Sequence, residues 1–213
     1  MPTPQPLAYA CPAFYRTAMR LIYGRHHQAR FKTIADLIEP GASVVDVCAG
    51  EGYIYLKYLK AKGNDYLGLD LSPAMVSWAA KRGIKARVFD ARQDQLPQAD
   101  YVIMLGSLCQ FMPGQAEMIK KLLAAARQKL IVSEPVRNLT GAKNPWLAHL
   151  SRFLVAPLGR PVFFQGQRFD TDSFERLCRS FSELESLFST PGGREMVAVF
   201  KGQAGFRSAG QGA

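Results

Sequence analysis

The stretch from Val44 to Tyr53, which reads Val-Val-Asp-Val-Cys-Ala-Gly-Glu-Gly-Tyr, constrains the fold of this chain more than any other segment. Valines around a single acid are typical of a buried strand, and Gly50 and Gly52 can end that strand in a tight turn. A segment able to form a helix follows at once. Such a turn lets a ligand lie against the backbone, and the N–H groups that begin the helix point toward it. The turn is therefore predicted to hold a nucleotide-like cofactor.

Strand-like and helix-like segments alternate along the rest of the chain. Helices are expected at 13–38, 53–61, 72–81, 115–126 and 170–180, and strands at 43–47, 66–71, 85–89, 101–105, 129–133, 184–189 and 195–201. This alternation predicts a parallel sheet with helices on both faces. Pro191-Gly192-Gly193 between the last two strands is typical of a hairpin turn. The expected fold is α/β, a Rossmann-like, doubly wound sheet of seven strands, mostly parallel, with an antiparallel C-terminal hairpin.

The cysteines and the apolar segments bear on location. The four cysteines, at positions 11, 48, 109 and 178, are widely spaced and form neither a disulfide framework nor a metal-binding pair. No secretory leader is recognisable, and no apolar run approaches the roughly 20 residues that a membrane-spanning helix needs. We therefore expect a cytoplasmic protein that binds no metal.

A dinucleotide is the first cofactor to consider for the turn. The dinucleotide fingerprint, G-x-G-x-x-G/A, needs a small third residue so that the helix can pack closely on the strand. Here that third position holds Tyr55, which would block the close packing. The antiparallel hairpin also departs from the dinucleotide-binding fold, so this interpretation is disfavoured.

From about Ala42 to Glu134 the chain resembles the class I S-adenosylmethionine-dependent methyltransferases. Their first motif is an acid followed by small residues at alternate positions, here Asp46-Val47-Cys48-Ala49-Gly50-Glu51-Gly52, with Cys48 in place of the usual first glycine. The resemblance implies that the backbone of this turn contacts the methionine half of S-adenosylmethionine. It also implies that Asp46 helps to place the ammonium group of that cofactor.

The ends of the next strands match further motifs of this family. Asp70 closes the second strand, where a carboxylate can accept both hydrogen bonds of a ribose diol. Leu71 and Met75 would pack on the adenine. The resemblance further implies that Asp90 accepts a hydrogen bond from the adenine amino group and that the N–H of Ala91 donates to the ring.

The fourth strand ends in Leu105-Gly106-Ser107-Leu108-Cys109-Gln110. In the family, backbone carbonyls of this loop, here Leu105 and Gly106, meet the methionine ammonium, and Gln110 occupies a position often held by histidine. Tyr15, Tyr23 and Arg25 are expected to close over the methionine end of the cofactor.

Methyl transfer from a sulfonium depends mainly on in-line positioning, so no catalytic triad is expected and none is recognisable. A base is needed only where the acceptor must lose a proton. The candidates for such a base are His26, His27 and Glu134. The Asn/Asp-Pro-Pro-aromatic tetrad is missing after the fourth strand, which counts against exocyclic amines of bases and glutamine amides as acceptors. Paired cysteines typical of pyrimidine carbon-5 enzymes are missing as well.

The net charge of +10 is concentrated in two acid-free stretches, 1–35 and 135–169. We expect residues 1–41 to form an N-terminal helical cap, 42–202 the class I methyltransferase domain with 135–169 as an acceptor-side lid, and 203–213 a flexible tail. Both basic stretches would border the acceptor site. We therefore hypothesise an anionic small-molecule acceptor, or one presented at an anionic membrane that the amphipathic segment 144–156 contacts peripherally. The alternative for this segment is an ordinary lid helix packed on the core.

Three functions stay open at this point. The favoured one is a methyltransferase acting on a small molecule or lipid. An RNA methyltransferase would explain the positive charge, but no RNA-binding module or interleaving of aromatic and basic residues is recognisable, so nucleic acid is not the expected partner. A protein that binds the cofactor without catalysis is the third, and the three intact acids argue against it.

Overall fold

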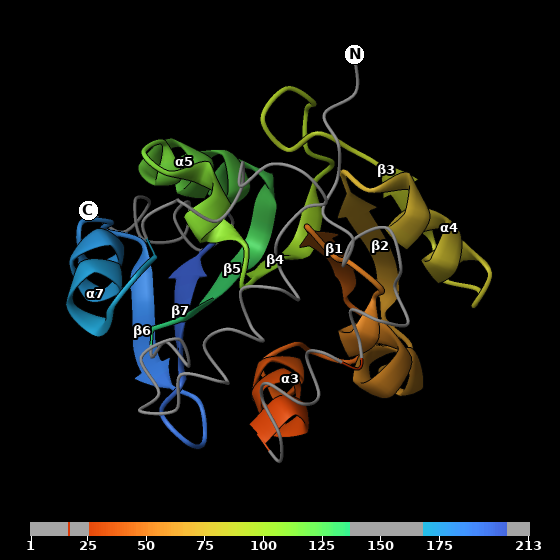
Figure 1. Cartoon of the computed structure of the whole chain (residues 1–213), viewed down its shortest axis with the longest axis horizontal. Coiled ribbons are helices and arrows are strands. Elements are labelled where there is room, and N and C mark those ends of the chain that lie inside the picture. The colour runs from red at the N-terminus through yellow and green to blue at the C-terminus, as the bar shows by residue number, and fades with distance from the viewer. Residues whose placement is uncertain (1–16, 18–25, 137–167, 204–213) are drawn as a thin grey trace, which may run out of the picture.

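The computed structural model describes residue 17, residues 26–136 and residues 168–203. In this part of the chain seven strands form one sheet in the order β3-β2-β1-β4-β5-β7-β6 (Figure 1). The strands are β1 (Ser43–Val47), β2 (Asp65–Asp70), β3 (Ala86–Val88), β4 (Ala99–Leu105), β5 (Ala126–Pro135), β6 (Leu184–Ser189) and β7 (Glu195–Lys201). The first five are parallel, and β7 is antiparallel to both β5 and β6. The predicted seven-stranded α/β fold is confirmed.

Helices cover both faces of the sheet. One face packs against α5 (Gln115–Ala125) and α7 (Thr171–Arg179) in a core that includes Val47, Met104 and Val132. The other face packs against α3 (His26–Asp36), α4 (Pro73–Ala80) and the helical segment after the glycine turn. That segment contains a π-helical part, Tyr55–Leu59, and a 3-10 part, Lys60–Lys62. A further 3-10 turn, η3 (Leu108–Phe111), follows β4.

The start of α4 follows the sequence prediction. The Ser72 hydroxyl accepts a hydrogen bond from the N–H of Met75 at 3.4 Å, and Pro73 occupies the first helical turn, where its missing N–H is harmless. This N-cap fixes where the chain leaves β2, and so it fixes the position of Asp70 at the end of that strand.

Several predicted features lie outside the described residues. They are Tyr15, Tyr23 and Arg25, most of the predicted lid at 135–169 with its amphipathic segment 144–156, and the tail beyond residue 203. Among the residues that the structure does describe, no helix has the length and apolarity needed to cross a membrane.

Candidate functional site

The turn after β1 is built from three residues in the left-handed region. Cys48, Gly50 and Gly52 have φ angles of 61°, 56° and 66°. A Cβ added to Gly50 would meet nothing within 4 Å, whereas one added to Gly52 would lie 2.7 Å from Cδ1 of Ile84. The two glycines therefore serve different purposes. Gly50 leaves the outer side of the turn open to a ligand, and Gly52 lets the turn pack closely on the protein.

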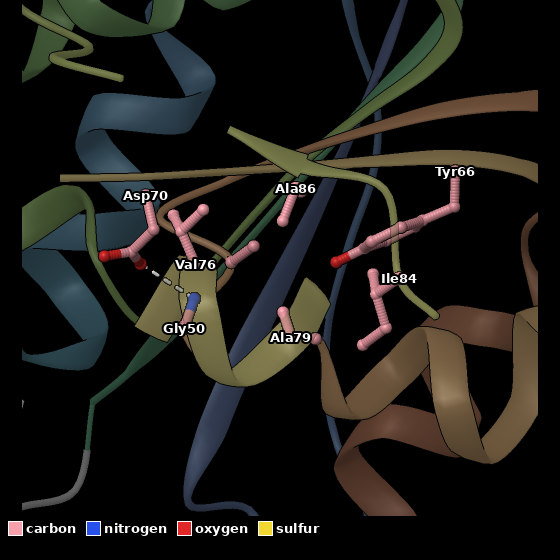
Figure 2. A pocket seen from close by; sticks show the side chains of 10 residues that line it. Gly50, Tyr66, Asp70, Val76, Ala79, Ile84 and Ala86 are labelled. Carbon is pink, nitrogen blue, oxygen red and sulfur yellow. Dashed lines mark hydrogen bonds between the residues drawn. The ribbon is translucent and has the colours of Figure 1, made fainter. Parts of the chain in front are cut away.

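A narrow crevice is lined by residues of this turn, of β2 and β3, and of α4 (Figure 2). Small residues make up most of its lining, which consists of Ala49, Gly50, Gly52, Tyr66, Gly68, Asp70, Val76, Ala79, Ile84 and Ala86. The Ala49 N–H donates to the carbonyl of Leu69 at 3.0 Å, so the turn is tied directly to β2. Small side chains in this crevice explain how the turn approaches the strand that carries Asp70.

Asp70 joins the glycine turn to the start of α4. Its Oδ2 accepts a hydrogen bond from the Gly50 N–H at 2.8 Å, drawn as a dashed line in Figure 2, and its Oδ1 accepts from the Ser72 N–H at 2.8 Å. Burial raises the pKa of this carboxyl, and the two N–H donors act in the opposite direction. Each carboxylate oxygen can accept a second hydrogen bond, so Asp70 can hold the turn and a ribose diol together.

Two exposed apolar residues neighbour Asp70, one along the chain and one across the sheet. Leu71 is 53% exposed, and Val88, which is the register partner of Asp70 on β3, is 49% exposed. Met75, by contrast, is completely buried in the core. This corrects the expectation that Met75 packs on the adenine, because a fully enclosed side chain offers no surface to a ligand. Leu71 and Val88 are the apolar side chains that a planar base could cover.

Asp90 lies at the next strand end, where its carboxylate organises a turn. Oδ1 accepts from the Arg92 N–H at 2.9 Å and Oδ2 accepts from the side-chain amide of Gln93 at 2.9 Å. The methyl group of Ala91 is buried, and its carbonyl accepts from the Lys121 ammonium at 2.8 Å. These hydrogen bonds hold the turn in place. The role of Asp90 and Ala91 in contacting adenine stays a prediction.

The loop after β4 lies beside the glycine turn, because β1 and β4 are paired with Val47 opposite Met104. Leu105 ends β4, and Gly106 has a φ of 69°. Gln110 is exposed, and its carbonyl accepts from the Arg92 guanidinium at 2.6 Å. The structure therefore brings the loops after β1 and β4 to one edge of the sheet, as the prediction for the methionine half requires.

Asp46 differs from the expectation. It is buried on β1, and its Oδ2 accepts a hydrogen bond from the Tyr66 hydroxyl at 2.7 Å. Tyr55 stacks on Tyr66, with ring centroids 4.7 Å apart. Burial raises the pKa of Asp46 to about 7, against the hydrogen bond from Tyr66, which lowers it. Asp46 thus braces the sheet beneath the turn, and its partner Tyr66 gave no sequence signal beyond an apolar strand position.

The two histidines proposed as bases pack into the protein. The ring of His26 lies against Gly192 in the β6–β7 hairpin, 2.6 Å from the position that a Cβ of that glycine would take. His27 is buried, with its ring edge-on to Phe31 and Tyr53 at centroid distances of 5.4 Å and 5.0 Å. These contacts anchor α3 to the hairpin and to the glycine turn, which gives both histidines a structural role.

Glu134 is only 1% exposed, and its Oε1 accepts a hydrogen bond from the N–H of Leu108, at the start of η3. Burial raises its pKa to about 7. A general base must reach the proton that it removes, and this carboxyl is enclosed by protein. Glu134 therefore holds the loop after β4 and does not occupy the position of an exposed base.

The positive φ of Cys48 strains the backbone, and a substitution can measure this strain. A residue with a Cβ in the left-handed region is strained by about 1 kcal/mol, and glycine is not. Replacing Cys48 with glycine is expected to leave the free energy of unfolding unchanged or to raise it by up to about 1 kcal/mol, because relief of strain competes with the greater freedom of glycine in the unfolded chain. Urea unfolding of the Cys48→Gly and Cys48→Ala variants measures this. A Gly variant less stable than the Ala variant would contradict the strained geometry.

Comparison with known proteins agrees with this geometry. The family model described as "Methyltransferase domain" matches residues 17–181, more than half of the chain. No curated protein sequence matches the chain.

Solved structures share the fold at low sequence identity. Magnesium protoporphyrin IX methyltransferase from Synechocystis PCC 6803, with bound SAH, is 18% identical over 92% of this chain and 96% of its own, with a TM-score of 0.62. A TehB-like SAM-dependent methyltransferase from Corynebacterium glutamicum is 21% identical over 92% and 99%, with a TM-score of 0.60. A chain in the complex between the Haloferax volcanii Trm112 methyltransferase activator and a methyltransferase is 15% identical over 93% and 99%, with a TM-score of 0.67.

Three observations indicate the same family. They are the family match, the seven-stranded sheet with its antiparallel hairpin, and the glycine turn bound to Asp70. The chain belongs to the methyltransferase domain family and has the fold of the class I S-adenosylmethionine-dependent methyltransferases.

Proposed function

We propose that this protein transfers the methyl group of S-adenosylmethionine to a small-molecule acceptor. The observation that carries the proposal is the open outer side of Gly50 next to the Asp70 carboxylate. The open backbone at Gly50 suits the methionine chain, and the Asp70 carboxylate suits the ribose. Exposed Leu71 and Val88 suit the adenine.

The protein's part in such a reaction is positional. When bound, S-adenosylmethionine supplies an electrophilic methyl group, so in-line alignment with the acceptor can account for most of the rate. Asp70 would hold the ribose, and the loops after β1 and β4 would fix the sulfur end. The enclosed carboxyl of Glu134 and the packed rings of His26 and His27 favour an acceptor that needs no protein base from this group.

An anionic acceptor, or one presented at an anionic membrane, remains part of the proposal. Its support is the charge of the two acid-free stretches, most of which lies outside the described residues. The structure describes three arginines and lysines of those stretches, Arg30, Lys32 and Arg168; Arg30 pairs with Glu195 and Lys32 pairs with Asp36. These two therefore contribute little free positive charge, and the hypothesis depends on the remaining arginines and lysines.

Transfer of a labelled methyl group tests the proposal. The full chain is incubated with methyl-labelled S-adenosylmethionine and, separately, with a small-molecule extract, total RNA and anionic or neutral vesicles. We expect label in the small-molecule fraction, lost in the Asp70→Ala variant. Label in RNA, with binding that weakens steeply as salt rises, would favour the RNA methyltransferase alternative. Cofactor binding without label in any fraction would favour a non-catalytic protein.

A further inference from the structure

Four buried or partly buried groups form a continuous chain of polar contacts from α3 to the loop after β4. The Arg30 Nε lies 2.8 Å from Oε2 of Glu195, which is the first residue of β7. The other oxygen of Glu195 accepts from the Ser133 hydroxyl at 2.9 Å. The carbonyl of Ser133, on β5, accepts from the Gly106 N–H at 2.7 Å. The contacts join α3, two strands and the loop after β4, which are far apart in the sequence.

These contacts converge on Gly106. Besides holding Glu195, the Arg30 guanidinium lies over the turn, with one terminal nitrogen 3.5 Å from the position that a Cβ of Gly106 would take. Glu134, the residue after Ser133, accepts a hydrogen bond from the N–H of Leu108, which lies two residues after Gly106 in the loop. Neighbouring residues of β5 therefore hold both ends of the segment 106–108, and Arg30 lies over its first residue, Gly106.

The pair is costly to bury. Arg30 is 7% exposed and Glu195 is 1% exposed, and the removal of both charges from water offsets most of their mutual attraction. A buried pair of this kind adds little to stability compared with apolar side chains, although it fixes a geometry tightly. Leucine or methionine would suffice for packing at this place. A charged pair is explained if it sets the position of the loop.

We propose that Arg30 is a positioning residue that, through Glu195 and Ser133, sets the position of the 106–108 loop and so the binding of the cofactor's methionine half. Only the effect on cofactor binding rests on the proposed function, because the position of the loop is a property of the protein alone. The positioning role also explains why α3 is fixed by His26 and His27 at its start, because Arg30 follows one turn later on the same helix.

The test uses variants that keep each charge or remove only a hydroxyl, because loss of one buried partner could unfold the protein. Arg30→Lys removes the planar guanidinium, and Ser133→Ala removes the hydroxyl that Glu195 accepts. The matched control is Arg179→Lys in the exposed pair of Arg179 with Glu175, whose Nε–Oε1 distance is 2.7 Å. Each variant is first shown to be folded at the temperature of measurement by its circular dichroism.

Two measurements follow on the full chain. Hydrogen exchange of the Gly106 and Leu108 amides is expected to speed up about tenfold in Arg30→Lys and in Ser133→Ala, and not in Arg179→Lys. The dissociation constant for S-adenosylhomocysteine is expected to rise about tenfold in the same two variants. The double variant should be no weaker than the weaker single variant, since both changes act along one path.

The outcomes separate the two claims. Folded Arg30→Lys and Ser133→Ala proteins with wild-type exchange and wild-type affinity would overturn the positioning role. Faster exchange without a change in affinity would show that the loop is positioned by Arg30 but does not serve the cofactor, which also overturns the proposal. If the wild-type protein binds no S-adenosylhomocysteine at all, the proposed function fails, and the exchange data alone decide whether Arg30 sets the loop.

Discussion

Replacement of Asp70 with alanine is expected to weaken the binding of S-adenosylhomocysteine about 100-fold. Two hydrogen bonds from a ribose diol to a carboxylate contribute roughly 3 kcal/mol together, and that energy corresponds to a factor of about 100 in the dissociation constant. The same variant removes the acceptor for the N–H groups of Gly50 and Ser72, so the ligand-free protein should also lose roughly 2 kcal/mol of stability. Titration calorimetry and urea unfolding measure the two effects.

The chain offers a matched control for this variant. Asp65 begins the strand that Asp70 ends, is exposed, and pairs with Lys85 at the opposite edge of the sheet. Asp65→Ala removes the same charge and should bind S-adenosylhomocysteine as the wild type does. Asp70→Asn should fall between the two, since an amide keeps one acceptor oxygen. Wild-type affinity in Asp70→Ala would mean that the ribose does not lie at Asp70.

The second large effect expected is a loss of stability as pH rises from 5 to 8. Burial raises the pKa of Asp46 from 3.8 to about 7 and that of Glu134 from 4.5 to about 7. Between the unfolded and folded pKa values the folded protein holds a proton that the unfolded chain has released, so stability is present at low pH and is lost as pH rises through this window. Over the whole window from pH 3.8 to about 7 the shift at Asp46 alone corresponds to roughly 4 kcal/mol, of which roughly 3 kcal/mol is lost above pH 5.

Variants of the Asp46–Tyr66 pair assign this pH dependence. Asp46→Asn cannot ionise, so its stability should fall less between pH 5 and pH 8 than that of the wild type, with Glu134 accounting for the remainder. Tyr66→Phe removes the hydrogen bond that favours the ionised form, so it should extend the loss of stability to higher pH. Urea unfolding at several pH values measures both, and an unchanged slope in Asp46→Asn would exclude Asp46 as the source.

The sequence predicted the local features of the fold well. The strands at 43–47, 184–189 and 195–201 have the predicted bounds, and the Ser72 cap and the antiparallel hairpin are present. These features depend on neighbours in the sequence: valine-rich runs favour strands, and serine before proline favours the start of a helix. The acids at the strand ends could be found in the same way, since parallel strands bring their carboxyl ends to one edge.

What the sequence could not predict depends on contacts between distant residues. The Asp46–Tyr66 hydrogen bond, the enclosure of Met75 and the Arg30–Glu195 pair join elements that only the folded sheet brings together. The left-handed conformation of Cys48 was hidden because cysteine gives no sign of it, although the glycine usual at this position in the family was a hint. His26, His27 and Glu134 could be considered candidate bases only until the contacts of the two rings and the burial of Glu134 were known.

We propose that the glycine turn after β1, from Cys48 to Gly52, binds the methionine half of S-adenosylmethionine. Titration calorimetry of the wild-type chain with S-adenosylhomocysteine and, separately, with NAD tests it most directly. We expect saturable binding of S-adenosylhomocysteine with a dissociation constant on the order of micromolar, about −8 kcal/mol, and no binding of NAD. Binding of NAD, or an absence of binding to S-adenosylhomocysteine by the folded protein, would contradict it.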